Sequence, residues 1–197
     1  MGTRLSAAAL DDVLLLKLES DDGYPRLSRA VMQALAGEIR RLARAPEFVG
    51  AVITGNERAF AVGADIAELA QLRVDEGFEF SRRGQDVMAT IARSRKPVVA
   101  AVRGFCFGGR LDLALACGAR IASPDAIFAH PGGTLGIVTG WGGTQRLPRL
   151  IGRGRALEMF VTGARIGADE ARAGGLISDV VSSEELVREA LRLVRQI

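Results

Sequence analysis

The sequence predicts an α/β fold. Short apolar runs with the length and composition of buried strands alternate with longer stretches in which apolar residues recur at helical spacing. Glycine, proline or a polar turn separates most of these segments, so the chain consists of repeated β–α units. Its 197 residues, 48% of them hydrophobic, are enough for one well-packed domain and few for two. We therefore expect a single domain over residues 1–197, with a core over about residues 13–181 and a C-terminal helix over about residues 183–197.

The first half of the chain contains the clearest elements. Residues 13–19 have the apolar composition of a buried strand, and a turn over residues 21–25 follows them. Ser28 is suited to cap a helix that extends to about Ala45. The other elements expected in this half are a strand over 49–54, a helix that starts at Asp65 with Glu68 at capping-box spacing, a helix over about 75–94 that Gly77 interrupts early, and a strand over 98–103.

The second half begins with a helix that opens at Gly108 and Gly109 and extends to Cys117. Short strands are expected over residues 119–122 and 127–129. A loop rich in glycine, threonine and proline follows, and the remaining chain has mainly helical spacing, punctuated by glycines.

The chain is mildly basic, and arginine carries almost all of its positive charge. The formal net charge is +3, and Lys17 and Lys96 are the only lysines. No basic run is interleaved with aromatic residues, so we expect a solvated arginine-rich surface and no nucleic-acid partner. Such a surface would also attract a polyphosphate ligand. No apolar run has the length of a membrane span or of a signal core, and Cys106 and Cys117 form no disulfide framework, so we expect a cytoplasmic protein that does not enter membranes.

Two glycine-rich segments, residues 59–66 and 104–112, carry the strongest functional signal. In each, a strand-like run ends in glycine and a helical pattern begins soon after. The first backbone N–H groups of a helix have no partner within it, and the helix dipole favours negative charge there. Two such helix starts that face each other would form an oxyanion hole for charge developing on a carbonyl oxygen.

Both segments, and a third over residues 140–147, resemble the enoyl-CoA hydratase/isomerase (crotonase) family, in the family's order and approximate spacing. The similarity extends from about Val13 to the C-terminus. The resemblance implies a right-handed spiral of ββα units and a role in fatty acid metabolism. It implies coenzyme A as part of an acyl thioester substrate, no permanently bound cofactor, and a homotrimer or dimer of trimers. Family members usually continue beyond the equivalent of Ile197, so we expect a fold that lacks their C-terminal helical extension.

The resemblance places the two oxyanion-hole donors on the backbone of Ala64 and Gly109. Small side chains suit these positions, because a thioester carbonyl must come within hydrogen-bonding distance of the backbone. Asp65 neighbours Ala64, but a helix-capping role suits it better than proton transfer. The residues that the resemblance places along the substrate and its coenzyme A are Ala61, Gly63, Ala64, Asp65, Ile66, Ala67, Gly108 and Gly109.

The acid–base residues of the family have changed in this chain. Hydratases of the family use two glutamates around a water; the first aligns with Asp112 and the second with Gly132. Asp112 stands between two leucines, so it is expected to point inward, where burial would raise its pKa. His130 is the only histidine and is a second candidate for proton transfer, although a structural role is the alternative. It lacks the partners of a zinc site, so we expect no metal.

Two further residues bear on the acyl pocket, where Gly132 also lies by the resemblance. Arg110 replaces a glycine that is usual in the family; it either points to solvent or faces the pocket, where it could pair with a carboxylate of a malonyl-type thioester. Trp141, the only tryptophan, either lines the pocket or serves as a packing plug.

These residues leave two classes of function open. The first is an enzyme that stabilises an acyl-CoA enolate. Hydration is its default reaction by resemblance, but loss of the second glutamate favours isomerisation, decarboxylation or thioester hydrolysis, each of which needs one proton-transfer group. The second is a non-catalytic acyl-CoA-binding or scaffolding protein that keeps the oxyanion hole without the acid–base pair.

Overall fold

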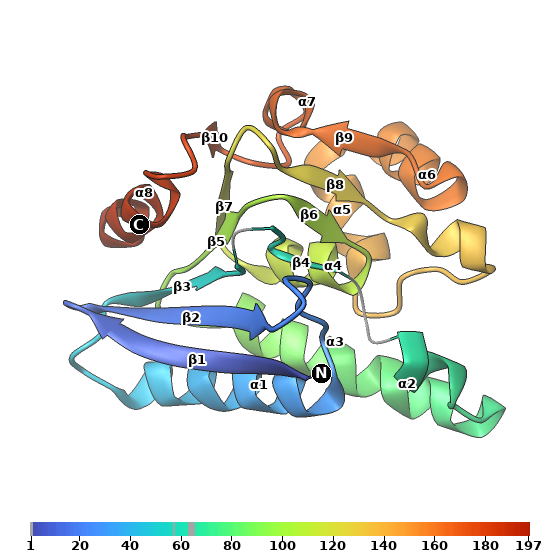
Figure 1. The fold of residues 1–197 in the computed structure, drawn as a ribbon, viewed down its shortest axis with the longest axis horizontal. Helices are drawn as coiled ribbons and strands as arrows, with labels where there is room; N and C mark the ends of the chain where they lie inside the picture. The colour runs from blue at the N-terminus through green and yellow to red at the C-terminus, as the bar shows by residue number, and fades with distance from the viewer. Residues whose placement is uncertain (1, 57, 63–65) are drawn as a thin grey trace.

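The fold is that of a computed structural model, which describes residues 2–56, 58–62 and 66–197. Within these residues the strands form two sheets (Figure 1). The larger sheet has six strands in the order β1-β2-β3-β5-β7-β10. β1 pairs antiparallel with β2, and all other neighbours in this sheet are parallel. Their bounds are Thr3–Leu10, Val13–Ser20, Gly50–Thr54, Val98–Val102, Ala119–Ala122 and Asp179–Val180.

The smaller sheet has four strands in the order β4-β6-β8-β9. Their bounds are Ala61–Val62, Phe105–Phe107, Ile127–Ala129 and Arg165–Gly167. Along the chain, each of three strands of the larger sheet is followed by one strand of the smaller sheet and then by a helical segment: β3 by β4, β5 by β6, and β7 by β8. This order is compatible with the expected repeat of ββα units, and the prediction of an α/β fold is confirmed.

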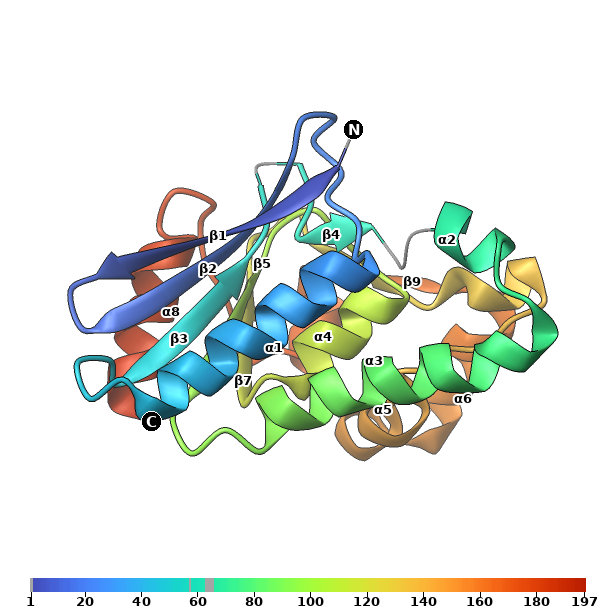
Figure 2. The same cartoon turned by 90° about the horizontal axis from the view of Figure 1, so that it is seen from below.

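Helices cover both faces of the larger sheet. α1 (Arg29–Arg44) and α3 (Gly77–Ala92) lie side by side on one face, and α8 (Leu186–Gln196) packs against β3 and β5 on the other (Figure 2). The remaining helical segments are α2 (Ile66–Ala70), η1 (Val74–Glu76), α4 (Gly109–Ala116), η2 (Pro131–Leu135), α5 (Gly143–Ile151), α6 (Arg153–Thr162) and α7 (Ala168–Ala173). None of the helices in the described residues is long and apolar enough to cross a membrane.

Local sequence explains the best-predicted helix. The Ser28 Oγ accepts a hydrogen bond of 3.4 Å from the Val31 N–H, so it caps α1 as expected. Leu35, Ile39 and Leu42 follow Val31 at helical spacing, and all four are buried against the sheet. The expected strands at β2, β3, β5, β7 and β8 and the helix at α4 are likewise confirmed, β7 and β8 with the expected bounds and the others with ends shifted by one residue. α8 lies within the range of about 183–197 that was expected for the C-terminal helix.

Several elements differ from expectation. β1 is a full strand that the sequence did not predict, because alanines and polar residues dominate it and its pairing with β2 provides the order. Gly77 does not interrupt a helix but is the first residue of α3, after the turn η1. The Glu68 carboxylate accepts a hydrogen bond of 3.2 Å from the Arg29 N–H. The other half of the expected capping box, Asp65, lies outside the described residues.

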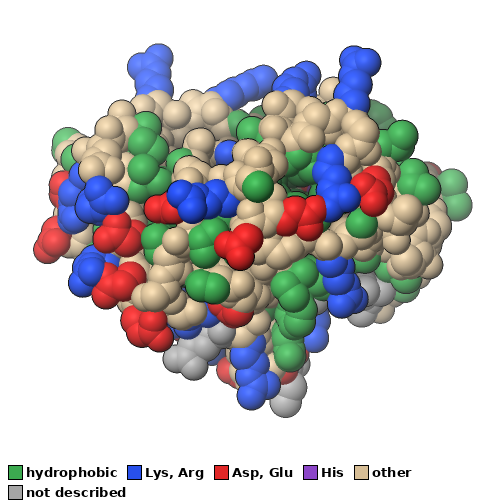
Figure 3. Space-filling model, turned by 90° about the horizontal axis from the view of Figure 1, so that it is seen from above, with side chains coloured by type: hydrophobic (Ala, Val, Ile, Leu, Met, Phe, Trp, Pro, Cys, Tyr) green, Lys and Arg blue, Asp and Glu red, His purple; other side chains and the backbone are tan. Residues whose placement is uncertain are grey.

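Basic and acidic side chains are interspersed on the face shown in Figure 3. Several pairs of basic and acidic side chains in the described residues lie along helices, as Arg155 and Glu158 do at 2.6 Å. Two arginines do not belong to this solvated surface. Arg120 is buried, and its guanidinium donates to the backbone carbonyls of Ala114, Cys117 and Leu176, which ties the end of α4 to the segment before β10. Arg110 is buried completely.

Candidate functional site

The two glycine-rich segments leave the smaller sheet from neighbouring strand ends. β4 and β6 are parallel, and Val62 at the end of β4 pairs with Phe107 at the end of β6 (Figure 1). Gly108 and Gly109 follow Phe107 directly. Gly63, Ala64 and Asp65, which follow Val62, lie outside the described residues. The topology therefore starts both segments at the same edge of the sheet.

Gly108 and Gly109 form the start of α4. Gly108 has a φ of 60°, which suits glycine, and its N–H donates to the Ala129 carbonyl at 3.0 Å. Gly109 is the first helical residue, so its own N–H has no acceptor within the helix. A Cβ added to Gly109 would lie 2.5 Å from the indole of Trp141, so only glycine fits this packed position.

A mainly apolar cavity of about 320 Å³, here called the α4 cavity, opens at the start of α4. Gly108 and Gly109 line it, together with the polar side chains of Ser81, His130 and Thr139. Apolar side chains of several elements complete the wall: Leu69, Leu72, Phe80, Phe107, Leu135, Ile137, Val138 and Trp141. Small-molecule sites have this character, with an apolar wall and a few polar groups.

Asp112 and His130 meet beside this cavity. Asp112 lies on the first turn of α4 and is completely buried. The Thr139 hydroxyl donates a hydrogen bond to its Oδ2, and the Nε2 of His130 lies 3.7 Å from its Oδ1. His130 and Thr139 line the α4 cavity, and Asp112 lies behind them. The two sequence candidates for proton transfer are thus in one cluster, with Asp112 directed inward as expected.

Burial moves the pKa values of this pair in opposite directions. It raises the pKa of Asp112 to about 6, although the Thr139 hydroxyl, the backbone N–H groups of Trp141 and Gly143, and Arg146 partly oppose the rise. Burial also lowers the pKa of His130 to about 4. At pH 7 the imidazole is therefore neutral, and most molecules carry an ionised Asp112.

The third glycine-rich segment makes room for the pair. A Cβ added to Gly143 would lie 2.1 Å from the Asp112 Oδ1 and 3.1 Å from the Cε1 of His130. Gly143 is the first residue of α5, so this helix can approach the carboxylate only because no side chain intervenes.

Gly132, the position of the second family glutamate, lines the α4 cavity but has little space for a side chain. A Cβ there would lie 2.8 Å from the Ile137 carbonyl oxygen. The Ile137 N–H also donates to the Gly132 carbonyl at 3.0 Å, which closes the loop on itself. The backbone packs closely around this glycine, so position 132 supplies no carboxylate to the α4 cavity.

The structure adds information on three side chains near the site. Arg110 does not point to solvent, and the described lining of the α4 cavity does not include it. Trp141 lines the α4 cavity and is only 4% exposed. Thr139 was missed as a partner of Asp112. Its only sequence signal is a hydroxyl within a glycine-rich loop, and Thr134 in the same loop carries the same signal without contacting the site.

Replacing Thr139 with valine should raise the pKa of Asp112 above its wild-type value of about 6. The hydroxyl stabilises the ionised carboxylate, and a hydrogen bond to a charged group of about 1.5 kcal/mol corresponds to roughly one pKa unit. Carbon-13 NMR titration of aspartate carboxyl groups would measure the change. Thr134→Val is the matched control, because its hydroxyl donates to the Pro131 carbonyl instead. An unchanged Asp112 titration in Thr139→Val would contradict the contact.

The buried pair should also leave an opposed signature in the pH dependence of stability. His130 titrates near pH 4 in the folded chain and near 6.5 when unfolded, so its contribution to stability is lost as the pH falls through this window. Asp112 has a raised pKa in the folded chain, so its contribution is present at low pH and is lost as the pH rises through 6. In wild type the two effects largely cancel.

Single replacements should separate these effects. Between pH 7.5 and 5, His130→Gln should gain about 1 to 2 kcal/mol of unfolding free energy relative to wild type, and Asp112→Asn should lose a similar amount. Urea denaturation at the two pH values gives both differences. If both variants follow the wild-type pH dependence, the pair does not have the opposed pKa shifts described above.

In the described part of the chain, no three histidine, cysteine, aspartate or glutamate side chains are grouped as a metal site would require. Among the described residues, the polar groups of the site are the backbone N–H groups at the start of α4, the Asp112 carboxylate, the His130 imidazole and the hydroxyls of Ser81 and Thr139 around an apolar cavity.

Comparison with known proteins adds independent findings. A family model described as enoyl-CoA hydratase/isomerase matches residues 11–197. The chain is 46% identical over 147 residues to crotonyl-CoA hydratase of Syntrophomonas wolfei, covering 74% of this chain and 56% of that protein. It is 41% identical over 152 residues to short-chain-enoyl-CoA hydratase of Clostridium acetobutylicum, covering 77% and 58%. The chain thus spans little more than half the length of these two relatives.

The structure is similar to solved structures as well. The crystal structure of enoyl-CoA hydratase from Bacillus anthracis superposes with a TM-score of 0.92 at 34% identity, covering 98% of this chain and 75% of that one.

Proposed function

Because this chain belongs to the enoyl-CoA hydratase/isomerase family, we propose that it removes and returns a proton next to the carbonyl of an acyl-CoA thioester. The observation that carries this proposal is that the start of α4 and His130 line the same apolar cavity, and that the Asp112 carboxylate lies 3.7 Å from the Nε2 of His130. The N–H groups of Ala64 and Gly109 would hold the enolate oxygen, which is the charge that an oxyanion hole stabilises.

Coenzyme A enters this proposal as part of the substrate. The segment over residues 61–67 and the Gly108–Gly109 turn would border its adenine and pantetheine portions, mainly through backbone groups. The adjacency of Val62 and Phe107 supports this, because both segments continue from that edge. The acyl group would then occupy the α4 cavity, whose wall is mainly apolar.

Asp112 and His130 would work as a relay. In the removal step, a carbon-bound proton moves to the unprotonated Nδ1 of His130 while the proton on Nε2 moves to Asp112 Oδ1. The substrate becomes an enolate, the carboxylate becomes neutral, and the imidazole carries no net charge at the end. This suits a buried ring whose pKa is lowered to about 4. The 3.7 Å between Nε2 and Oδ1 must shorten in the substrate complex, as catalytic contacts often do.

The site supports double-bond isomerisation better than hydration. In an isomerisation the proton removed from one carbon is returned to another, so one proton-transfer group suffices. Hydration of an enoyl group needs a second group to activate water, and Gly132 offers none at the family's second position. The relatives' names make hydration the competing enzymatic outcome.

A binding-only protein is the second candidate, and the tight backbone around Gly132 is the observation that favours it. Such a protein would keep the cavity and the oxyanion donors without turnover. The buried pair with opposed pKa shifts favours the enzyme, because an ionisable pair is costly to bury without a function.

We expect a cytoplasmic homotrimer or dimer of trimers, without nucleic-acid or membrane partners. The exposed side chains of Leu157 and Val161 on α6, which are 62% and 67% accessible, support self-association.

Mass spectrometry of an acyl-CoA panel incubated with the protein in deuterated water would test the function. The panel contains saturated, 2-enoyl, 3-enoyl and malonyl-type thioesters. We expect deuterium incorporation with migration of the double bond between the 2- and 3-enoyl forms. Net water addition would replace isomerisation by hydration, and loss of carbon dioxide or release of free coenzyme A would identify a decarboxylase or a hydrolase. Binding without any change in mass would overturn the enzyme proposal in favour of the binding protein.

A further inference from the structure

We propose that Trp141 sets the upper limit on acyl length, by forming the wall between the α4 cavity and a second apolar cavity. This inference rests on the proposed function for the identity of the ligand. The second cavity, here called the α1/α3 cavity, lies between the two long helices that cover the larger sheet (Figure 2).

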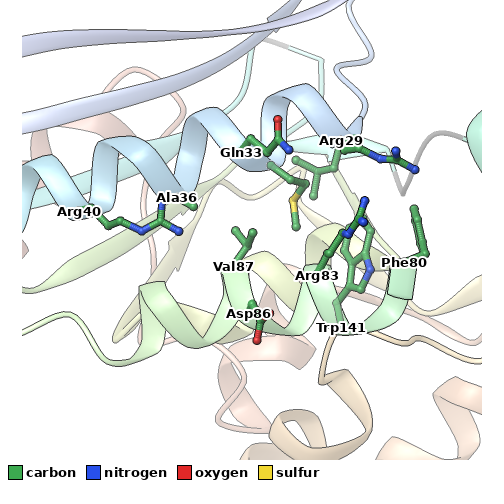
Figure 4. Close-up of a pocket in the computed structure, with 12 residues that line it drawn as sticks. Arg29, Gln33, Ala36, Arg40, Phe80, Arg83, Asp86, Val87 and Trp141 are labelled. Atoms are coloured by element: carbon green, nitrogen blue, oxygen red, sulfur yellow. The ribbon is translucent and has the colours of Figure 1, made fainter. Parts of the chain in front are cut away.

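The α1/α3 cavity has a volume of about 220 Å³. Its apolar lining comes from both helices and includes Met32, Ala36 and Val87. Figure 4 shows Phe80 and Trp141 at one end of this cavity and Ala36 and Arg40 toward the other. Charged side chains such as Arg40, Arg83 and Asp86 line its margin. The interior therefore suits an alkyl chain, which gains free energy when it leaves water.

Phe80 and Trp141 are the only residues, among those described, that line both cavities. Their ring centroids lie 5.5 Å apart. The indole fills the gap between α3 and α4: a Cβ on Gly84 would lie 2.0 Å from it, and a Cβ on Gly109 would lie 2.5 Å from it. Two helix backbones thus contact Trp141 from either side, and the side chain separates the two apolar spaces.

The loop that carries Trp141 is fixed to α3 and α5. The Gln85 Nε2 donates to the Gly140 carbonyl at 2.8 Å, and the Arg146 guanidinium donates to the Trp141 carbonyl at 3.2 Å. The wall is thereby held in place through the backbone carbonyls of Gly140 and of Trp141 itself. An acyl tail that enters beside Gly109 would end at the indole, whereas a smaller side chain at residue 141 would let it continue toward Val87.

Binding of saturated acyl-CoA thioesters of increasing length to wild type and Trp141→Ala would test the wall. In wild type, octanoyl-CoA should bind no more tightly than butanoyl-CoA. In Trp141→Ala, each methylene that enters the second cavity should tighten binding roughly fourfold, which corresponds to about 0.8 kcal/mol per buried CH₂. Trp141→Leu opens a smaller passage between the two cavities, and it replaces Trp141→Ala in this test if the alanine variant does not fold.

Two further variants serve as controls. Trp141→Phe keeps an aromatic wall and should keep the wild-type length preference. Adding Val87→Phe to Trp141→Ala fills the second cavity from α3 and should restore the preference for butanoyl-CoA. Val87 is partly buried and, in the described residues, lines only the α1/α3 cavity, so this change does not alter the α4 cavity directly.

The outcomes separate this inference from the proposed function. Trp141 is not a wall if octanoyl-CoA already binds to wild type roughly fourfold more tightly per methylene than butanoyl-CoA does. The same conclusion follows if Trp141→Ala keeps the wild-type length preference. In both cases the proposal that the chain binds acyl-CoA stands. If no thioester binds either protein, the proposed function is wrong, and 1-octanol then tests the wall alone. Tighter octanol binding by Trp141→Ala than by wild type supports the wall, and equal binding overturns it.

Discussion

Asp112→Asn should slow exchange of the proton next to the thioester carbonyl by about 10²- to 10⁴-fold, the range that general acid–base groups contribute. The asparagine keeps the size of the side chain and can still accept from the Thr139 hydroxyl. It cannot take up the proton that the relay delivers. Hydrogen–deuterium exchange of a saturated acyl-CoA, measured against wild type at pH 7.5, gives the ratio directly.

The same measurement has an expected pH dependence. Because burial raises the pKa of Asp112 to about 6, the wild-type rate should fall as the pH decreases through 6 and the carboxylate becomes protonated. Asp125→Asn is the matched control. The Asp125 carboxylate accepts a hydrogen bond from the Ser123 hydroxyl and does not line the α4 cavity. An Asp112→Asn variant that exchanges at the wild-type rate would remove the carboxylate from the mechanism.

Gly109→Ala should reduce exchange by on the order of 10²-fold or more, comparable to loss of one oxyanion-hole donor. The added methyl group would lie 2.5 Å from the Trp141 ring and beside the N–H proposed to hold the enolate oxygen. Either the indole or the start of α4 must shift, and both border the cavity. Steady-state exchange rates measured over a range of thioester concentrations should show a lower maximal rate for Gly109→Ala than for wild type.

Gly84→Ala controls for displacement of the indole. Its methyl group would lie 2.0 Å from Trp141 from the α3 side, without approaching the start of α4. If displacement alone explained the loss, both variants would lose activity equally. The proposed hole requires the larger loss in Gly109→Ala, and equal losses would argue against a role for the Gly109 N–H.

Much of this architecture could be predicted because the responsible interactions are local. Ser28 caps α1 through its own hydroxyl, and the turn at Gly108 follows from a φ that glycine tolerates. The strand β1 could not be predicted in this way, since its residues have weak strand preference and its order comes from pairing with β2. Local sequence carries no information about such pairing.

The site could be predicted only in part for the same reason. Asp112 and His130 were recognised singly, but their contact depends on how closely α5 approaches at Gly143, which is a tertiary feature. Thr139 has no local signal that distinguishes it from Thr134. Arg110 is buried although a cation at the start of a helix is more easily placed in solvent, and the sequence offered nothing to reverse that preference.

Proton NMR of butanoyl-CoA in deuterated water isolates enolate formation, because a saturated thioester can be enolised but can neither isomerise nor be hydrated. With the wild-type protein, the signal of the two protons next to the carbonyl should decay, and Asp112→Asn should suppress the decay. If butanoyl-CoA binds and those protons remain unexchanged, this site does not form the proposed enolate.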